Sequence, residues 1–318
     1  MQKLTLGHDG PTASRIALGC MHLSRAWDAT PLTNEERRNT QALLETALTH
    51  GINLFDHADI YARGKSERLF GEALRAAPEL RRNMLLQSKC GIRFADDPPD
   101  TPQRYDFSFD HITASVDGIL SRLGVDYIDI LLLHRPDPLA QPEEVARAFD
   151  DLHAAGKVRH FGVSNHSAGQ ISLLQKHLRQ PLVANQLELS LHHHHLISEG
   201  ILVNQPDGNA AHAAGLLDFC RLHDIRVQAW APLAGGRFAG DADDDPVTVL
   251  LRKLADAHGV AVEAILLAWL LRHPAGIQPI VGTTNPARLA ASCAADTVEL
   301  SREDWYALLT AARGVKVP

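Results

Sequence analysis

The sequence predicts an α/β fold, and within that class a (β/α)8 barrel, for a chain of 318 residues. Three observations favour this fold. Short, almost continuously apolar runs recur along the chain, as in strands that are buried on both faces. Between them lie segments with apolar residues at helical spacing, and several of these segments end at a glycine, a frequent helix terminator. The candidate strands number eight, which is enough to close such a barrel.

The first predicted helix has a sequence signal at each end. Thr33 and Glu36 have the spacing of a capping box, apolar residues follow at helical spacing, and Gly51 ends the segment. Two further helices are predicted over 110–123 and 143–155. The candidate strands are 15–19, 52–56, 84–89, 127–134, 158–165, 182–186, 225–230 and 277–282.

An open, doubly wound sheet is the alternative arrangement of the same alternating elements. No Gly-x-Gly-x-x-Gly motif follows any candidate strand, which counts against that alternative as a dinucleotide-binding fold. No segment of the chain has the composition of a linker between domains. We therefore expect a single TIM barrel domain over residues 1–318, with long loops at its C-terminal rim at 91–109, 189–212 and 234–246.

The amino-acid composition limits which kinds of binding partner are expected. The chain has 31 basic and 38 acidic residues and a net charge of -7, which disfavours nucleic acid or an anionic membrane as a partner. The four cysteines are far apart and suggest neither a zinc site nor a disulfide framework. No targeting or membrane-spanning pattern is found. We expect a cytoplasmic protein, monomeric or a small homo-oligomer, that acts on a small molecule.

Four polar residues close or follow successive apolar runs: Asp56, Tyr61, Lys89 and His134. A tyrosine phenol has a pKa of about 10 and is a weak acid near neutrality. A nearby lysine ammonium would lower that pKa, a carboxylate would hold the ammonium in place, and an imidazole would orient a polar substrate. Together these groups suit proton transfer during carbonyl reduction.

Each of these residues, taken alone, also has an ordinary structural explanation, such as a turn former or a buried aromatic. Their joint occurrence favours a shared site, because the C-terminal ends of barrel strands meet at one rim that carries catalytic residues. Other polar or aromatic residues lie at further strand ends of the same predicted barrel. They are Ser164, Asn165, Gln186 and Trp230.

Five segments, in chain order, have a characteristic sequence: GINLFDHADIY, SRLGVDYIDILLLHRPD, GKVRHFGVSN, QAWAPLAGG and PIVGTTNPARLAAS. In these segments the sequence resembles the aldo-keto reductases, in particular bacterial NADPH-dependent members, and the resemblance spans nearly the whole chain. It implies a barrel that binds a nicotinamide cofactor across its C-terminal rim and reduces aldehydes or ketones to alcohols. It also implies that Tyr61 is the proton donor of a tetrad completed by Asp56, Lys89 and His134.

The resemblance also implies a set of cofactor-binding residues. Ser164, Asn165 and Gln186 would bind the nicotinamide carboxamide, and Trp230 would stack on the ring where tyrosine is common. The adenosine 2′-phosphate would meet Arg288, which favours NADPH and leaves NADH as an alternative. Gly282 stands where some members have lysine, and Ser292 stands where asparagine is frequent. The remaining residues expected along the cofactor are Gly19, Asp56, Leu233, Gly235, Gly236, Thr283 and Thr284.

Other features leave alternatives open. Trp27 and Phe94 are expected to line the substrate pocket, although core packing or exposure would also explain them. The run His192 to His195 does not favour a metal site, because consecutive side chains point in different directions. The resemblance includes potassium-channel β subunits, so a cofactor-binding regulatory subunit is the second functional hypothesis. A barrel aldolase or isomerase that uses Lys89 as a Schiff base is the third.

Overall fold

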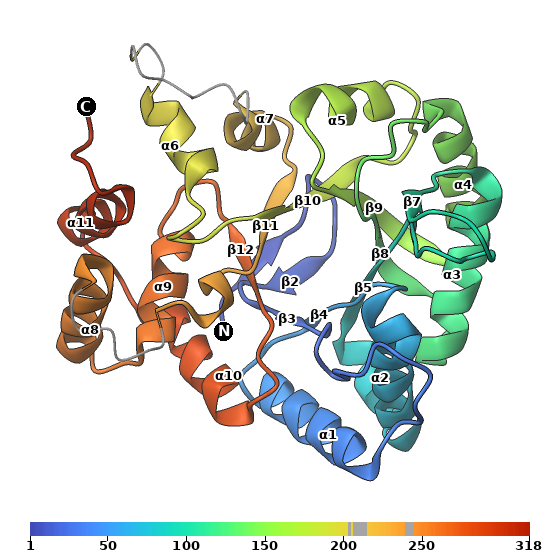
Figure 1. Cartoon of the computed structure of the whole chain (residues 1–318), viewed down its shortest axis with the longest axis horizontal. Coiled ribbons are helices and arrows are strands. Elements are labelled where there is room, and N and C mark those ends of the chain that lie inside the picture. Colours follow the sequence, from blue (N-terminus) through green and yellow to red (C-terminus); the bar gives the residue numbers. More distant parts are fainter. Residues whose placement is uncertain (203–204, 206–214, 239–244) are drawn as a thin grey trace.

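The computed structural model describes residues 1–202, 205, 215–238 and 245–318. Eight parallel strands form a closed barrel, in chain order around the ring, and the last strand closes on the first (Figure 1). The predicted TIM barrel is confirmed, and the open sheet is not the architecture of this chain. The barrel strands are β3 (Ala17–Gly19), β4 (Leu54–Asp56), β5 (Leu85–Cys90), β8 (Ile128–Leu133), β9 (Val158–Ser164), β10 (Leu182–Glu188), β11 (Arg226–Trp230) and β12 (Gln278–Val281).

Helices surround the barrel, as Figure 1 shows. The predicted capping box is present in α1, where the Thr33 hydroxyl accepts from the Glu36 backbone N–H and the Glu36 carboxylate accepts from the Thr33 N–H at 2.8 Å. The helices predicted over 110–123 and 143–155 are α3 and α4. The helices of the ring are α1 (Asn34–Thr49), α2 (Lys65–Ala76), α3 (Phe109–Leu123), α4 (Pro142–Ala154), α5 (Ala168–Gln175), α7 (Leu216–Leu222), α9 (Val262–Leu271) and α10 (Pro286–Cys293), with α6 (His195–Leu202), α8 (Pro246–His258) and α11 (Arg302–Arg313) beside them.

The barrel interior contains an apolar cluster and a chain of hydrogen-bonded amides. A hairpin of β1 (Lys3–Thr5) and β2 (Thr12–Ser14) contributes Leu6 and Ala13 to the apolar cluster. The amide of Gln228 donates to Gln278 at 2.9 Å and to Gln87 at 3.1 Å. These glutamines lie inside otherwise apolar strands, and their mutual hydrogen bonds offset the cost of burying polar groups. The barrel residues of the apolar cluster are Ala17, Leu54, Ile130, Leu132, Val183, Ala184 and Ile280.

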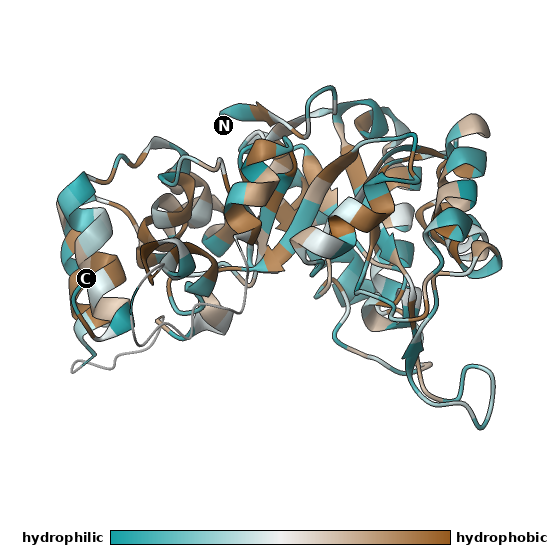
Figure 2. Ribbon diagram, turned by 90° about the horizontal axis from the view of Figure 1, so that it is seen from above, coloured by the Kyte–Doolittle hydropathy of each residue, from teal (hydrophilic) through white to brown (hydrophobic). Residues whose placement is uncertain are grey.

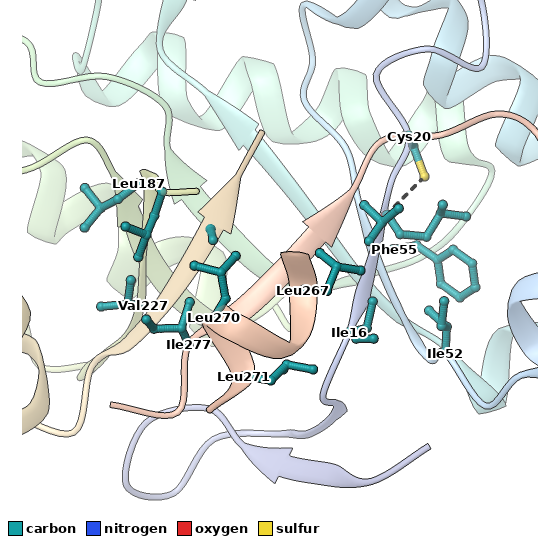
Figure 3. Close-up of a cluster of buried hydrophobic side chains, with 14 of the residues drawn as sticks. Ile16, Cys20, Ile52, Phe55, Leu187, Val227, Leu267, Leu270, Leu271 and Ile277 are labelled. Carbon is teal, nitrogen blue, oxygen red and sulfur yellow. Dashed lines mark hydrogen bonds between the residues drawn. The ribbon is translucent and has the colours of Figure 1, made fainter. Parts of the chain in front are cut away.

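A larger apolar core lies between the strands and the helices. Figure 3 shows α9 placing Leu267, Leu270 and Leu271 in the same cluster as Val227 and Ile277. In Figure 2 the strands are largely hydrophobic, and the helices around them carry both hydrophobic and hydrophilic residues. No single helix in the described part of the chain is long and apolar enough to cross a membrane; α8 and α9 reach the required length and composition only as a pair bent by 93°.

The long loops of the rim are described in part. The predicted loop 91–109 contains a short antiparallel hairpin of β6 (Ile92–Arg93) and β7 (Arg104–Tyr105). The stretch that begins at residue 189 contains α6. Residues 203–204 and 206–212 of the second predicted loop, and 239–244 of the third, lie outside the described residues.

The close packing of α2 on α3 gives a prediction for stability. A Cβ atom added at Gly71 in α2 would lie 2.7 Å from the Leu123 carbonyl oxygen. Because backbone atoms cannot yield easily, we expect Gly71→Ala to lower the free energy of unfolding by about 1–3 kcal/mol. Gly169→Ala in α5 is the matched control, since no atom lies within 4 Å of the added carbon. Its stability should be unchanged or higher by up to about 1 kcal/mol. Urea unfolding followed by circular dichroism measures both, and equal midpoints would contradict the packing argument.

The burial of His57 gives a prediction for pH dependence. Its ring meets the ring of Phe70 edge-on at 4.6 Å, and neither ring nitrogen has a partner among the described residues. Burial, together with the charge of Lys89, lowers the pKa of His57 from 6.5 to about 3. Between these two pH values the unfolded chain binds a proton that the folded chain does not. Stability due to His57 should therefore fall as the pH drops below 6.5, by up to about 1.4 kcal/mol per pH unit.

Replacement of this histidine tests the effect. His57→Leu should have a shallower loss of stability between pH 6.5 and pH 4.5 than the unmodified protein, measured as the free energy of urea unfolding at each pH. His50→Gln removes an exposed histidine instead and should leave the slope as it is. An identical slope in His57→Leu would show that His57 titrates alike in both states.

Candidate active site

A buried lysine is the centre of the polar residues at the C-terminal end of the barrel. Lys89 lies near the end of β5 and is fully buried. Its Nζ donates to Asp56 Oδ2 at 2.8 Å, to the His57 carbonyl at 2.8 Å and to the Tyr61 hydroxyl at 2.9 Å. An ammonium has three N–H donors, so all of them are used. The Tyr61 oxygen thus accepts from Lys89, and its own hydrogen is left to point elsewhere.

Two amide side chains hold the carboxylate that pairs with this lysine. Asp56 Oδ1 accepts from Gln87 at 2.6 Å and from Gln186 at 3.0 Å. Gln87 lies on β5 and Gln186 on β10, so Asp56 cannot turn away without losing hydrogen bonds to two strands. A buried ion pair whose remaining atoms are hydrogen-bonded in this way tolerates the loss of one partner poorly.

Burial and neighbouring charges both shift the pKa values of Lys89 and Tyr61. Burial lowers the pKa of Lys89, but Asp56 and Tyr61 outweigh it, so the pKa is raised and the ammonium form persists. Burial raises the pKa of Tyr61, and the nearby Lys89 opposes that increase without cancelling it. Lys89 thus lowers the pKa of Tyr61, as predicted, but the pKa remains above its ordinary value because burial of the phenolate raises it by more. A charged, fully hydrogen-bonded Lys89 is also unsuited to attack a carbonyl as a Schiff-base nucleophile.

His134 follows β8 and faces the tyrosine. The two rings are nearly perpendicular, with centroids 6.0 Å apart. Burial, with the charges of Lys89 and Arg135, lowers the pKa of His134 well below its usual value. Its Nδ1 is buried and has no partner among the residues that the structure describes. The imidazole is therefore neutral near pH 7, with one nitrogen as donor and the other as acceptor.

The turn after Tyr61 is conformationally unusual and connects three loops. Ala62 and Arg63 have φ values of 47° and 54°, in the left-handed region that residues with a Cβ rarely adopt. The Arg63 Nε donates to the Trp27 carbonyl at 2.8 Å, and its guanidinium lies 4.6 Å from the ring of Phe94. Trp27 and Phe94 meet edge-on at 6.4 Å. The two residues predicted to line the pocket are thus adjacent, beside the turn that carries Tyr61.

A second cation fastens the loop that carries Trp27. Lys65 is buried at the start of α2, and its Nζ donates to Asp28 at 2.9 Å and to the Thr30 hydroxyl at 3.0 Å. Hydrogen bonds to Thr30 and to Lys65 keep the pKa of Asp28 below its ordinary value. Because Lys65 and Arg63 both follow Tyr61 closely, the same short segment holds the tyrosine and the loop that carries Trp27.

The residues expected at the carboxamide lie together on β9, β10 and β11. The Ser164 hydroxyl donates to the Gln186 carbonyl at 2.9 Å and accepts from Asn165 at 2.8 Å. The Trp230 indole donates to Asn165 Oδ1 at 3.2 Å. Gln186 joins this group to Asp56, so the structure brings both predicted sets of residues to one end of the barrel.

The loops after β11 and β12 contain the residues expected along the rest of the cofactor. Gly235 and Gly236 have positive φ values of 64° and 86° and no atom within 4 Å of an added Cβ, so their backbone is open to a close ligand. Arg288 is exposed in the first turn of α10 and forms no ion pair with a described residue. Leu233, Thr283 and Thr284 are half-buried in these loops, and Gly282 is exposed.

Two residues that were expected to contact the cofactor, Ser292 and Gly19, do not face an open surface. Ser292 is buried, and its hydroxyl donates to the Arg288 carbonyl at 2.8 Å, so it faces its own helix rather than the surface. Gly19 is explained by packing, since a Cβ there would lie 3.1 Å from the Ile280 side chain. The structure brings neither residue to an open surface of the rim.

Several residues of the site were not predicted from the sequence. Gln87 and Gln228 lie within apolar strands, and a lone amide in such a run is a signal that could have identified them. Arg63 and Lys65 follow Tyr61 directly, and their contacts depend on loops far away in the sequence. No local pattern predicts such contacts.

The histidine run has its own contacts. His194 Nδ1 lies 2.7 Å from the Ser198 hydroxyl, and the rings of His193 and His195 meet edge-on at 4.3 Å. His192 approaches Phe238 with centroids 6.5 Å apart. Within the described ranges, no three histidine, cysteine or acidic side chains are grouped so that they could hold a metal ion.

Comparison with known proteins agrees with this architecture. An oxidoreductase of Bacillus subtilis described as uncharacterized, YcsN, is 39% identical over the full length of both chains. A 6-dehydroglucose reductase of Novosphingobium aromaticivorans is 39% identical, over 98% of this chain and 96% of its own. The solved structure of the glycerol dehydrogenase of Gluconobacter oxydans matches with a TM-score of 0.81 and 25% identity, over 99% of this chain and 96% of its own.

The family model described as the aldo/keto reductase family matches residues 15–312. This range includes the whole barrel and every residue of the candidate site. With that match, and with relatives of high identity over the full chain, the protein belongs to the aldo/keto reductase family of oxidoreductases.

Proposed function

We propose that the protein reduces an aldehyde or ketone to an alcohol with NADPH, and that Tyr61 is the proton donor. One observation carries the proposal: the Tyr61 oxygen accepts a hydrogen bond from the Lys89 ammonium at 2.9 Å. Its hydroxyl hydrogen is then available to a substrate oxygen at the mouth of the barrel. A buried, charged donor behind the phenol also stabilises the phenolate that remains after transfer.

The remaining residues of the site have roles that follow from their contacts. Asp56 keeps Lys89 charged and fixed at 2.8 Å. Neutral His134, beside Tyr61, donates to the carbonyl oxygen and aligns it, which stabilises the negative charge that develops there. A bound nicotinamide would supply the hydride for the carbonyl carbon. Tyr61 would give its phenolic proton to the carbonyl oxygen, which becomes the hydroxyl of the alcohol. Trp27 and Phe94, which meet edge-on, would give the substrate an apolar surface beside Tyr61.

The described residues fit a nicotinamide dinucleotide. Trp230 offers an aromatic face, fixed by its hydrogen bond to Asn165. Asn165, Ser164 and Gln186 offer amide and hydroxyl groups for a carboxamide. The open backbone at Gly235 and Gly236 suits a pyrophosphate. The exposed, unpaired Arg288 supports a 2′-phosphate contact and hence NADPH rather than NADH.

The relatives indicate a direction for substrate tests. Two relatives, of 39% and 36% identity, are described as 6-dehydroglucose reductases. We include hydroxylated aldehydes and ketones of sugar type among the candidate substrates for this reason.

Replacement of the tyrosine tests the proton-donor role. Tyr61→Phe should bind NADPH with nearly unchanged affinity and lose about 100-fold or more in kcat, because only the transferred proton is removed. The measurement is NADPH oxidation with aromatic, aliphatic and sugar-type carbonyls, beside cofactor binding by tryptophan fluorescence. Tyr105→Phe, a half-exposed tyrosine in the β6–β7 hairpin, is the matched control. Full activity of Tyr61→Phe would refute the role. Tight cofactor binding by the unmodified protein without turnover on any carbonyl would favour a regulatory subunit.

The cofactor preference has a separate test. Arg288→Gln should raise the KM for NADPH by about 10- to 100-fold and leave the KM for NADH within about twofold, because only NADPH carries the 2′-phosphate. Arg302→Gln, at the exposed start of α11, removes the same charge elsewhere and should change neither value. Equal effects of Arg288→Gln on both cofactors would contradict a contact with the 2′-phosphate.

A further inference from the structure

An arginine that the proposed mechanism does not use lies at the mouth of the barrel. Arg135 directly follows His134, after the end of β8, and its Cζ lies 5.9 Å from the centre of the Trp230 ring, at the end of β11. In the ring of strands, β9 and β10 lie between β8 and β11, and the Trp230 indole reaches back to Asn165, just after β9. The guanidinium and the indole thus meet over the C-terminal ends of the strands between β8 and β11.

The guanidinium of Arg135 has no anionic partner among the described residues. It is half-buried, yet it forms no ion pair and donates no hydrogen bond to any of them, and its recorded contact is the Trp230 ring. Other cations near the rim are paired: Arg93 with Asp106 at 3.0 Å, and Lys65 with Asp28 at 2.9 Å. Partial burial of a cation without a counter-ion costs free energy, which an aromatic ring offsets only in part, so a bound anion would be favourable there.

The carboxylates nearby do not neutralise it. Asp56 is already occupied by Lys89, Gln87 and Gln186. Glu188 lies beside Trp230 in the strand register, but it forms no ion pair with Arg135 in this structure. Arg135 adjoins His134 in the chain, and its charge adds to burial and to Lys89 in lowering the pKa of His134.

We propose that Arg135 determines substrate specificity by binding an anionic group, a carboxylate or a phosphate, on the carbonyl substrate. This inference rests on the proposed reductase function. A guanidinium binds either anion through two parallel hydrogen bonds. Arg135 follows His134, whose ring centre lies 6.0 Å from that of Tyr61, so a substrate with its anionic end at Arg135 would place its carbonyl near the Tyr61 hydroxyl. Arg63, another guanidinium on this side of the barrel, donates to the Trp27 carbonyl, whereas Arg135 donates to no described residue.

Matched substrate pairs test the proposal. The first pair is 4-carboxybenzaldehyde and its methyl ester, and the second is glyceraldehyde 3-phosphate and glyceraldehyde. Each pair differs in the negative charge and keeps the carbonyl. For at least one pair, the unmodified enzyme should favour the anionic member by about tenfold or more in kcat/KM, and the pair that shows it distinguishes carboxylate from phosphate.

Three variants complete the design. Arg135→Gln should reduce the ratio between the members of that pair to about one and leave the neutral member within about twofold of its original kcat/KM. Arg135→Lys should retain part of the preference, because the charge remains without the planar fork. Arg38→Gln, exposed on α1, removes an equal charge away from the mouth and should retain the full ratio.

The outcomes separate this inference from the reductase proposal. Turnover of neutral and anionic carbonyls with equal kcat/KM would overturn the inference and leave the reductase standing. The same holds if Arg135→Gln raises the KM for NADPH and slows both members of a pair alike, since Arg135 would then serve the cofactor. Absence of turnover on every carbonyl would overturn the reductase function, and the inference with it.

Discussion

The hydrogen bonds of the Lys89 ammonium are the interaction on which the site depends. A fully buried cation is costly, and here it is accommodated because each N–H has an acceptor, one of them a carboxylate. The carboxylate of Asp56 is fixed in turn by two glutamine amides. Loss of any member would leave a buried charge or donor unpaired, so this network tolerates only one arrangement. The orientation of Tyr61 is a consequence of that arrangement.

The barrel brings together residues that lie at the ends of neighbouring strands. Asp56, Lys89 and His134 come from β4, β5 and the end of β8, which are neighbours in the ring, so their side chains meet without any loop having to fold over. Below them, the apolar cluster and the chain of glutamine amides fill the interior and keep the strands at a fixed spacing. The proposed pocket wall has a different origin, since Trp27 and Phe94 lie on loops and are held by Arg63. The proposed proton-transfer residues are thus fixed by strands and buried hydrogen bonds, and the proposed wall by a few contacts between loops.

The sequence allowed the strands, the barrel and the grouping of polar residues to be predicted, because alternation and strand ends are local patterns. The capping box of Thr33 and Glu36 is of the same kind. What could not be predicted depends on distances between remote segments. The balance between burial and the charge of Lys89 decides the pKa of Tyr61, and composition carries no measure of burial. The inward-facing hydroxyl of Ser292 and the stacking of Arg63 on Phe94 also depend on packing.

The charge of the whole chain is a poor guide to the charge at the mouth. The net charge is -7, yet Arg63, Arg135 and Arg288 all lie at the C-terminal rim without an acidic partner among the described residues. Charges separated by more than about 10 Å are largely screened at physiological ionic strength, so a ligand near the rim responds to these arginines more than to distant acidic residues. Local cations within a partly desolvated opening attract anions even on an acidic protein. An anionic dinucleotide, and a substrate with an acidic group, are therefore compatible with an overall composition that disfavours nucleic acid.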